Sequence, residues 1–385
     1  MRDTYLPYGQ QWLDDEDIQA VVDVLKGSYL TTGPTIVKFE ESVAEYVGAK
    51  YAVAFSNGTA ALHGACFASG IGEGDEVITT PITFAASANS VRYVGGTVVF
   101  ADINEDTYNI DPLEIEKKIT PNTKAIIPVH FTGQPVQLSE IHAIARKHNL
   151  IVIEDAAHAL GAEYKGEKIG ALSDMTMFSF HPVKHVTTGE GGVITTNNEV
   201  LYKKLLQFRS HGITREASNL SRNDGPWYYD MKFLGFNYRM TDIQAALGIS
   251  QLRKLEQFVA RRREIAQIYN EAFKGNECIF IPTQHVDGIS SWHLYVIKLN
   301  LGNISVSRQE IFEALLAQNI GVNVHYIPVH TLSYYQELGY VEGSMPKAEE
   351  LYDAIITLPL FPKMSNEDVM DVIDSVIMEL EKVKK

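Results

Sequence analysis

The sequence predicts an α/β protein whose central sheet is mostly parallel and covered by helices on both faces. From residue 51 onward, short apolar segments alternate with helical segments, which is typical of parallel strands joined by crossover helices. The 385 residues are 45% hydrophobic and 21% charged, so they can bury a large core. Because the pattern changes after about residue 240, we expect a large domain with an N-terminal arm over residues 1–250 and a smaller α+β domain over residues 251–385.

Two helices are expected before the sheet begins. Residues 14–26 carry apolar side chains at helical spacing, with acidic residues in the first turn and Gly27 just after the last turn. A second helix is expected over residues 37–47. The polar segment 28–34 between them is either a simple connection or a lip of a substrate site.

Strands and helices then alternate along the large domain. The expected strands are residues 51–55, 76–80, 97–101, 124–130, 151–154, 175–180 and 192–195. The expected helices are residues 60–68, 84–94, 139–148 and 200–207. Ligands of such sheets bind beyond the carboxyl ends of the strands, so functional side chains are expected there.

The C-terminal part begins with one long helix, expected over residues 242–273. Its basic cluster at residues 261–263 is interpreted as a solvated or interdomain face, because the chain as a whole is acidic. The elements expected beyond it are strands over residues 294–299 and 322–326 and helices over residues 307–318 and 366–385.

Composition excludes several classes of partner. The formal net charge of -15 argues against a nucleic-acid or anionic-membrane surface. The cysteines Cys66 and Cys278 lie far apart without metal-ligand spacing, so buried free thiols and no metal site are expected. The N-terminus lacks the apolar core of a signal peptide, and no run of about 18 apolar residues is present. The sequence therefore predicts a cytoplasmic protein that binds small molecules.

One lysine lies in a segment that suits covalent chemistry. Lys184 stands between an apolar strand and a glycine turn, flanked by His181, Pro182 and Val183 and not by other charges. A lysine amine acts as a nucleophile when it is held in place and partly desolvated, which lowers its pKa. Lys184 is therefore a candidate Schiff-base nucleophile, and the alternative is an ordinary surface lysine in a loop.

A carboxylate and a phosphate-binding turn complete the candidate site. Asp155 follows a buried strand, where it could cap a helix, bind a metal or pair with a cationic ring nitrogen. The last role is the one that makes pyridoxal phosphate (PLP) an electron sink. The turn at residues 56–59 ends a strand and starts a helix, as a phosphate site requires, and Ser179 offers a further hydroxyl. No triphosphate or dinucleotide motif is present.

The chain resembles the sugar aminotransferases of the DegT/DnrJ/EryC1/StrS family over nearly its whole length. The matching segments include residues 7–9, 30–34 and 358–362. The motifs at residues 128–135, 179–192 and 225–229 are similar to the branch that aminates UDP-4-keto-6-deoxy-N-acetyl-β-L-altrosamine in pseudaminic acid biosynthesis. The resemblance implies a fold-type I PLP-dependent aminotransferase with a large, mostly parallel, seven-stranded α/β/α domain.

The resemblance also implies a role for each site residue. Lys184 would bind PLP covalently, and Asp155 would pair with its ring nitrogen. Phe84 would stack on the ring, and His158, where many members have glutamine, would lie near the ring hydroxyl with its tautomer and charge left open. The phosphate would be held by Gly58, Thr59 and Ser179 and, from the neighbouring subunit of a homodimer, by Asn237.

The substrates implied by the resemblance are a UDP-sugar and L-glutamate. The candidate sugar contacts are Tyr8, Thr31, Tyr238, Arg239, His325 and Tyr326. Three alternatives stay open: a related enzyme for the D-gluco UDP-4-keto isomer or a dTDP-keto-sugar, a non-catalytic PLP-binding regulatory protein, and a dehydratase of the related group that replaces the lysine with histidine. The presence of Lys184 argues against the dehydratase. The fold alone decides none of these.

Overall fold

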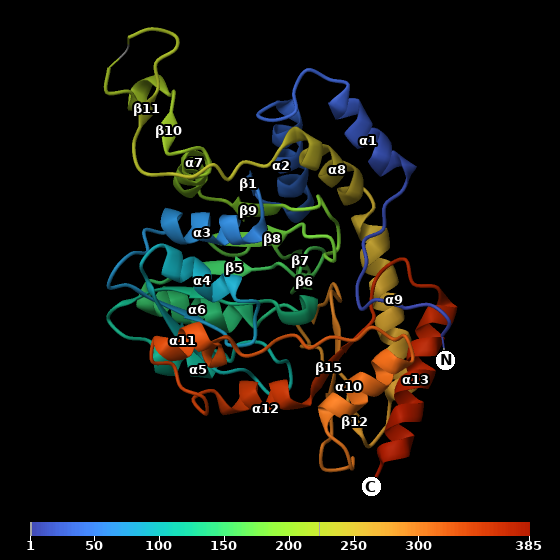
Figure 1. Ribbon diagram of the computed structural model, residues 1–385. Helices are drawn as coiled ribbons and strands as arrows, with labels where there is room; N and C mark the ends of the chain where they lie inside the picture. The colour runs from blue at the N-terminus through green and yellow to red at the C-terminus, as the bar shows by residue number, and fades with distance from the viewer. Residues whose placement is uncertain (1, 223) are drawn as a thin grey trace.

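A computed structural model describes residues 2–222 and 224–385 (Figure 1). Its central sheet has seven strands in the order β1-β9-β8-β5-β4-β2-β3. They are β1 (Tyr51–Phe55), β2 (Glu76–Thr79), β3 (Thr97–Phe100), β4 (Thr123–Ile127), β5 (Ile151–Asp155), β8 (Met175–Ser179) and β9 (Gly192–Thr196). Strand β9 runs antiparallel to its neighbours β1 and β8, and the other neighbouring strands of this sheet are parallel to each other. The predicted α/β class with a mostly parallel seven-stranded sheet is confirmed.

Consecutive residues of the strands enter two different hydrophobic clusters. Ile126 of β4 packs in one cluster, whereas its neighbours Ala125 and Ile127 pack in the other. Because successive side chains of a strand point to opposite faces, the two clusters lie on the two sides of the sheet. Both faces are therefore apolar, which is why the strands read as nearly continuous apolar segments.

Helices cover both faces of the sheet. One cluster includes α3 (Gly58–Ala68), α4 (Ala86–Tyr93) and α7 (Glu199–Phe208). The other includes α2 (Pro34–Val47), α5 (Pro112–Lys118), α6 (Leu138–His148), α8 (Asp242–Leu252) and α9 (Leu255–Phe273). The helix α1 (Asp15–Leu25) packs beside α8. The short elements of this part are η1 (Phe131–Gly133), β6 (Glu163–Tyr164), β7 (Glu167–Lys168), β10 (Ile213–Thr214), η2 (Ala217–Asn219) and β11 (Asp230–Met231).

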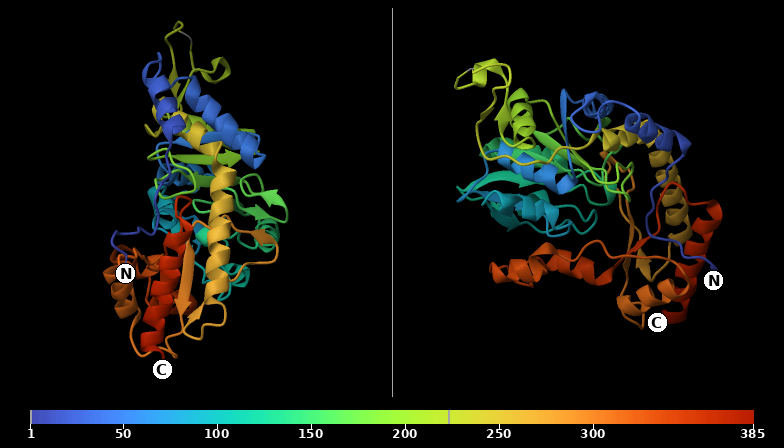
Figure 2. Two further views of the ribbon diagram at one scale, coloured as in Figure 1. Left: turned by 90° about the vertical axis from the view of Figure 1, so that its right-hand side faces the viewer. Right: turned by 45° about the horizontal axis from the view of Figure 1, so that its top comes forward.

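The C-terminal part has its own antiparallel sheet in the order β12-β14-β15. Its elements are β12 (Ile279–Phe280), β13 (Gly288–Ile289), β14 (Tyr295–Leu299), α10 (Arg308–Ala317), η3 (Val329–Thr331), α11 (Ser333–Glu337), α12 (Pro346–Ala354), β15 (Ile355–Leu358) and α13 (Asn366–Val383). Figure 2 shows α9 running along α13. Leu294 and Tyr335 pack in the same cluster as α3, so this part also buries side chains against the large sheet. The domain boundary at residue 250 stays a prediction.

The N-terminal segment lies against the C-terminal part (Figure 1). Arg2 forms ion pairs with Asp368 and Asp371 at 2.8 and 2.6 Å. Leu6 is buried in a third hydrophobic cluster, which side chains of α9, α10 and α13 form in the C-terminal part. Its backbone is hydrogen-bonded to Asn319 and Gly321 at 2.9 and 2.7 Å. The first residues therefore pack against the C-terminal part, on α13 and on residues 319–321.

Two expectations from the sequence were wrong. The helix expected over residues 242–273 is two helices, α8 and α9, because the chain turns at Lys254, whose ammonium pairs with Asp14 and Asp17. Both sides of the turn are apolar and buried, so the hydrophobic period does not reveal it. Residues 322–326 form no strand: only Asn323 bridges to β15, and the chain then leaves the sheet to line a cavity.

Other elements were missed by the sequence analysis. Helices α5 and α12 and strand β15 are short or lack a clear apolar period, and the hairpin β6–β7 has two residues in each strand. Cys66 and Cys278 are buried free thiols, as expected. Within residues 2–222 and 224–385, none of the helices has the length and apolar character needed to span a bilayer.

A buried carboxylate at the start of α8 also caps the start of α2. The Asp242 carboxylate accepts hydrogen bonds from the backbone N–H groups of Gly33 and Thr35 at 2.8 and 2.9 Å, and Asp242 is fully buried. These N–H groups lie at the N-terminus of α2, where the helix itself provides no acceptor for them. One side chain thus joins two helices that are about 200 residues apart in sequence.

We expect Asp242→Ala to lower the free energy of unfolding by about 2 kcal/mol, because two buried N–H groups lose their acceptor. Urea denaturation measures the change. Glu45→Ala, on the exposed side of the same helix α2, is the matched control and should stay within about 0.5 kcal/mol of the parent protein. Equal losses in the two variants would contradict the capping role.

Candidate active site

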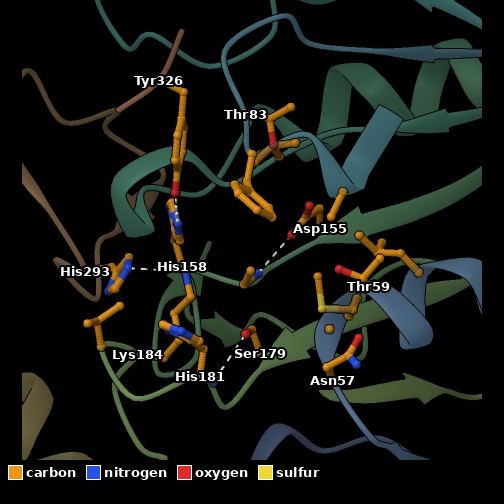
Figure 3. A pocket seen from close by; sticks show the side chains of 18 of the residues that line it. Asn57, Thr59, Thr83, Asp155, His158, Ser179, His181, Lys184, His293 and Tyr326 are labelled. Carbon is orange, nitrogen blue, oxygen red and sulfur yellow. Dashed lines mark hydrogen bonds between the residues drawn. The ribbon is translucent and has the colours of Figure 1, made fainter. Parts of the chain in front are cut away.

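A cavity of about 820 Å³ opens at the carboxyl ends of β5 and β8 (Figure 3). This is the edge at which ligands bind to parallel sheets. Eleven of the fourteen residues expected in the site line it: Tyr8, Gly58, Thr59, Phe84, Asp155, His158, Ser179, Lys184, Tyr238, His325 and Tyr326. The structure therefore brings together side chains from the N-terminal segment, the central sheet and the C-terminal part.

Asp155 is the last residue of β5 and lies at the base of the cavity. Its carboxylate accepts hydrogen bonds from the Ser87 hydroxyl at 2.6 Å and from the Ala157 N–H at 3.1 Å. Burial raises the pKa of Asp155, and these two donors counteract part of that effect. The Ala157 bond closes a turn that no helix follows, so the helix-cap interpretation of Asp155 is not needed.

Lys184 follows β8 and reaches the same cavity. Its Nζ lies 3.4 Å from Nε2 of His293. Because the amine lies inside the cavity and is partly withdrawn from water, desolvation lowers the pKa of Lys184 to about 8, although Asp155 partly opposes the change. A lysine in this position is no ordinary surface lysine, and a fraction of it is an unprotonated nucleophile near neutral pH.

The start of α3 forms the part of the cavity wall that suits an anion. Asn57 caps the helix by accepting a hydrogen bond from the Ala60 N–H at 2.8 Å, and the next two residues are Gly58 and Thr59. The first N–H groups of a helix lack intrahelical acceptors and attract negative charge. Ser179, at the end of β8, adds a hydroxyl on the same wall. Together these groups can bind a phosphate.

A close approach of β9 fixes this turn in place. At Gly192, an added Cβ atom would lie 2.5 Å from the Asn57 carbonyl oxygen and 2.8 Å from the Gly58 Cα. No side chain fits in that space, so the glycine that ends the 179–192 motif allows the strand to pass directly under the start of α3. The motif thus shapes the anion-binding turn as well as carrying Lys184.

An aromatic side chain also lines the cavity. The Phe84 side chain is 64% exposed, although it is large and apolar, because it faces the open space. The His158 Nε2 is paired with the Tyr326 hydroxyl at 3.0 Å, whereas its buried Nδ1 has no partner among the described residues. Burial and the charge of Lys184 hold the pKa of His158 well below its usual range, so His158 is neutral. A flat ligand can lie between these groups.

Three of the predicted contacts lie outside the cavity of this single chain. Thr31 is exposed and pairs with Thr241, and Asn237 is exposed and pairs with Ser210. Arg239 is partly buried, and its Nε has no partner among the described residues. Asn237 was expected to serve a neighbouring subunit, so its exposure agrees with that prediction, which remains untested.

Two residues near the reacting groups were missed in the sequence. Ser87 lies one helical turn after Thr83, and their hydroxyls are 2.7 Å apart, but nothing local shows that Ser87 meets Asp155. His293 lies 109 residues from Lys184 in sequence. Both contacts are products of tertiary packing, and a single sequence contains no signal for them.

Relatives of known description match the whole chain. The DegT/DnrJ/EryC1/StrS aminotransferase family matches residues 11–377. The spore coat polysaccharide biosynthesis protein SpsC of Bacillus subtilis is 45% identical over 377 residues, which cover 97% of each chain. The UDP-4-amino-4,6-dideoxy-N-acetyl-β-L-altrosamine transaminase of Campylobacter jejuni is 40% identical over 385 residues, which cover 99% of each chain.

Solved structures show the same fold. Helicobacter pylori PseC, an aminotransferase involved in the biosynthesis of pseudoaminic acid, has a TM-score of 0.92 at 35% identity, covering 98% of this chain and 100% of its own. Spr1654 from Streptococcus pneumoniae, solved in its PLP form, has a TM-score of 0.92 at 32% identity, covering 99% of this chain and 100% of its own. With the family match over residues 11–377, these likenesses establish that the chain belongs to the DegT/DnrJ/EryC1/StrS aminotransferase family and has its fold-type I architecture.

Proposed function

We propose that this protein is a PLP-dependent aminotransferase that moves an amino group from L-glutamate to C4 of UDP-4-keto-6-deoxy-N-acetyl-β-L-altrosamine. The observation that carries the proposal is the placement of a desolvated lysine, Lys184, and a buried carboxylate, Asp155, on the floor of one cavity. An aminotransferase needs this pair: an amine that attacks and moves protons, and an anion opposite the ring nitrogen.

The residues present fit PLP. When bound, PLP supplies an electron sink for the reacting carbon. Asp155 would hold the ring nitrogen, Phe84 would contact the ring face, and His158 would lie beside the ring at the cavity wall. The start of α3 and Ser179 would hold the phosphate. The relative Spr1654, solved in its PLP form, supports the same cofactor.

Lys184 has two tasks in the proposed reaction. It would hold the cofactor covalently until the amino donor takes its place, and the released amine would then remove the proton from the α-carbon of the donor. The second task needs an unprotonated amine. The lowered pKa of Lys184, about 8, makes such an amine available near neutral pH. The hydrogen bond from Ser87 keeps the Asp155 carboxylate directed at the cavity throughout.

The sugar assignment is supported by two relatives and challenged by a third. The Campylobacter relative is named for the altrosamine product, and PseC is named for pseudoaminic acid biosynthesis. SpsC, at the higher identity of 45%, is named for spore coat polysaccharide. A second candidate is therefore a 4-aminotransferase for the D-gluco UDP-4-keto isomer or for a dTDP-keto-sugar. We further propose a homodimer in which Asn237 of each subunit reaches the phosphate site of the other.

Product analysis tests the substrate directly. The protein is loaded with PLP and incubated with L-glutamate and, separately, with the L-altro and D-gluco UDP-4-keto-sugars, and each product is identified by NMR. We expect a 4-amino product from the L-altro substrate at a higher kcat/KM than from the D-gluco substrate. A reversed preference would replace the altrosamine assignment with the second candidate. Failure to form the pyridoxamine form with glutamate would contradict the whole proposal.

Substitution of Asp155 tests the electron-sink partner. We expect Asp155→Asn to fold and bind the cofactor but to lower kcat by about a hundredfold or more, because an amide cannot stabilise a protonated ring nitrogen. Single-turnover kinetics with glutamate measure the effect. Asp174→Asn, in which an exposed aspartate before β8 is changed in the same way, is the control and should keep kcat near the parent value.

Burial of Lys184 should cost stability in the cofactor-free protein. The folded-state pKa is lowered from 10.5 to about 8, so the cost is fully present below about pH 8 and disappears as the pH rises to about 10.5. We expect Lys184→Met to raise the free energy of unfolding by about 2 kcal/mol at pH 7, with a smaller gain at pH 10. Urea denaturation at the two pH values measures both; a gain that is independent of pH would contradict this explanation.

A further inference from the structure

We propose that His293 is a positioning residue for Lys184. Its Nε2 accepts a hydrogen bond from the Lys184 ammonium and so holds the end of this side chain at the floor of the cavity. The inference rests on the proposed function, because it concerns Lys184 while the amine is not bound covalently. It assigns a task to a side chain whose neighbours in sequence, Trp292 and Leu294, are core residues.

The geometry leaves His293 as the fixed partner of the amine. The Lys184 Nζ lies 3.4 Å from the His293 Nε2, and no second hydrogen bond to this Nζ is found within residues 2–222 and 224–385 (Figure 3). Asp155 attracts the ammonium electrostatically, but its oxygens are bonded to Ser87 and Ala157. Without His293, the four-carbon stem of Lys184 would have no polar anchor at its end.

The backbone of His293 is held from both sides. Its N–H donates to the Thr132 carbonyl at 2.8 Å, and its own carbonyl accepts from Nη1 of Arg262 at 3.0 Å. Residues 132–133 pass close to the backbone of His293. Gly133, with φ of +99°, permits this approach, because an added Cβ would lie 3.0 Å from the His293 nitrogen. The imidazole is therefore mounted on a backbone with little freedom to move.

Arg262 is an unusual support. It is 1% exposed and has no carboxylate partner among the described residues; its Nη1 donates to the carbonyls of Trp292, His293 and Leu360 at 3.4, 3.0 and 2.8 Å. Burial lowers the pKa of Arg262 to about 9. Burying an unpaired guanidinium is unfavourable, and the three carbonyl contacts offset only part of this cost, because Nε and Nη2 have no partner among the described residues. These contacts fix the segment that carries His293.

The charge state of His293 suits an acceptor. The groups that face Lys184 and His293 are Asp155 and His158 from the end of β5, His185 from the segment after β8, His325 from the C-terminal part and Arg262 from α9. Burial, reinforced by the nearby cations, holds the pKa of His293 well below its usual range. The ring is therefore neutral. Since an ammonium can only donate, the proposed contact requires an unprotonated Nε2 and places the proton on Nδ1, which is buried and has no partner among the described residues.

The ring is also confined laterally. Its centroid lies 4.4 Å from that of His158 and 5.4 Å from that of His185. His185 pairs with the Ser291 carbonyl through Nε2 and not with Lys184. It is therefore a matched control: a buried histidine in the same cluster, with the same kind of ring contact, that lacks the hydrogen bond to the amine.

The test measures the pKa of the Lys184 amine in the cofactor-free protein. Competitive acetylation at a series of pH values, followed by mass spectrometry of the peptide that contains Lys184, gives this pKa without cofactor or substrate. Because a hydrogen bond to the charged form favours that form, we expect His293→Phe to lower the pKa of Lys184 by roughly one unit. His185→Phe should leave it near the parent value. Equal pKa values in these two variants would overturn the proposal.

Conservative variants keep the test decisive if His293→Phe does not fold. His293→Gln places an amide oxygen near Lys184 and should keep the lysine pKa close to that of the parent, whereas the shorter His293→Asn should lower it as Phe does. Circular dichroism confirms that each variant is folded. If Gln and Asn give the same lowered pKa, acceptance by Nε2 is not the cause and the proposal fails.

A kinetic arm separates this inference from the proposed function. In the PLP-loaded enzyme, His293→Phe should lower kcat of the glutamate half-reaction with little change in KM. The pH at which kcat rises as Lys184 loses its proton should move to a lower value. If the parent protein does not transaminate at all, the proposed function fails while the acetylation result still decides the contact. If the parent is active and the variant has an unchanged profile, the positioning role fails alone.

Discussion

The site depends on the parallel pairing of β5 with β8. This pairing sets Asp155 opposite Met177, two residues before Ser179 and shortly before the segment that carries Lys184. Because both strands end at the same edge of the sheet, the carboxylate, the hydroxyl and the amine reach one space without any long loop. The antiparallel strand β9 then returns beneath the start of α3, where Gly192 leaves room for Asn57. An anion-binding turn is thereby placed beside the same two strand ends.

Much of this arrangement could be predicted from the sequence. The strands of the large sheet are marked by apolar runs, and Asp155 and Lys184 follow two of them directly, so their proximity follows from the rule for parallel sheets. The mouth of the cavity could not be predicted in this way. Residues 322–326 alternate apolar and polar side chains as a strand does, yet they make one bridge to β15 and then line the cavity. The competition between sheet pairing and cavity lining is decided by tertiary packing, which a single sequence does not show.

The polar environment of Lys184 illustrates a second limit. In sequence, His158, His185 and His293 are three scattered histidines, whereas in the fold they surround one amine. Each is neutral because burial disfavours its charged form, so the cluster provides hydrogen-bonding groups without adding charge. The charge of Asp155 raises the pKa of Lys184, but the effect of burial is larger, so the amine has a lowered pKa. The candidate site is thus built from a buried lysine and buried histidines, whose burial does not stabilise the fold.

The N-terminal segment gives the cavity wall an unusual connection. Arg2 forms an ion pair with α13, and the backbone of Leu6 is hydrogen-bonded to residues 319–321. The Tyr8 carbonyl accepts a hydrogen bond from the N–H of Leu360. The Tyr8 ring contacts His325 at a centroid distance of 5.3 Å. The chain then enters α1 and packs beside α8 near the large sheet. Tyr8 therefore sits on a strap that is fastened at both ends. Any widening of the cavity by separation of the C-terminal part from the sheet must stretch this strap, so its length limits how far the cavity can open.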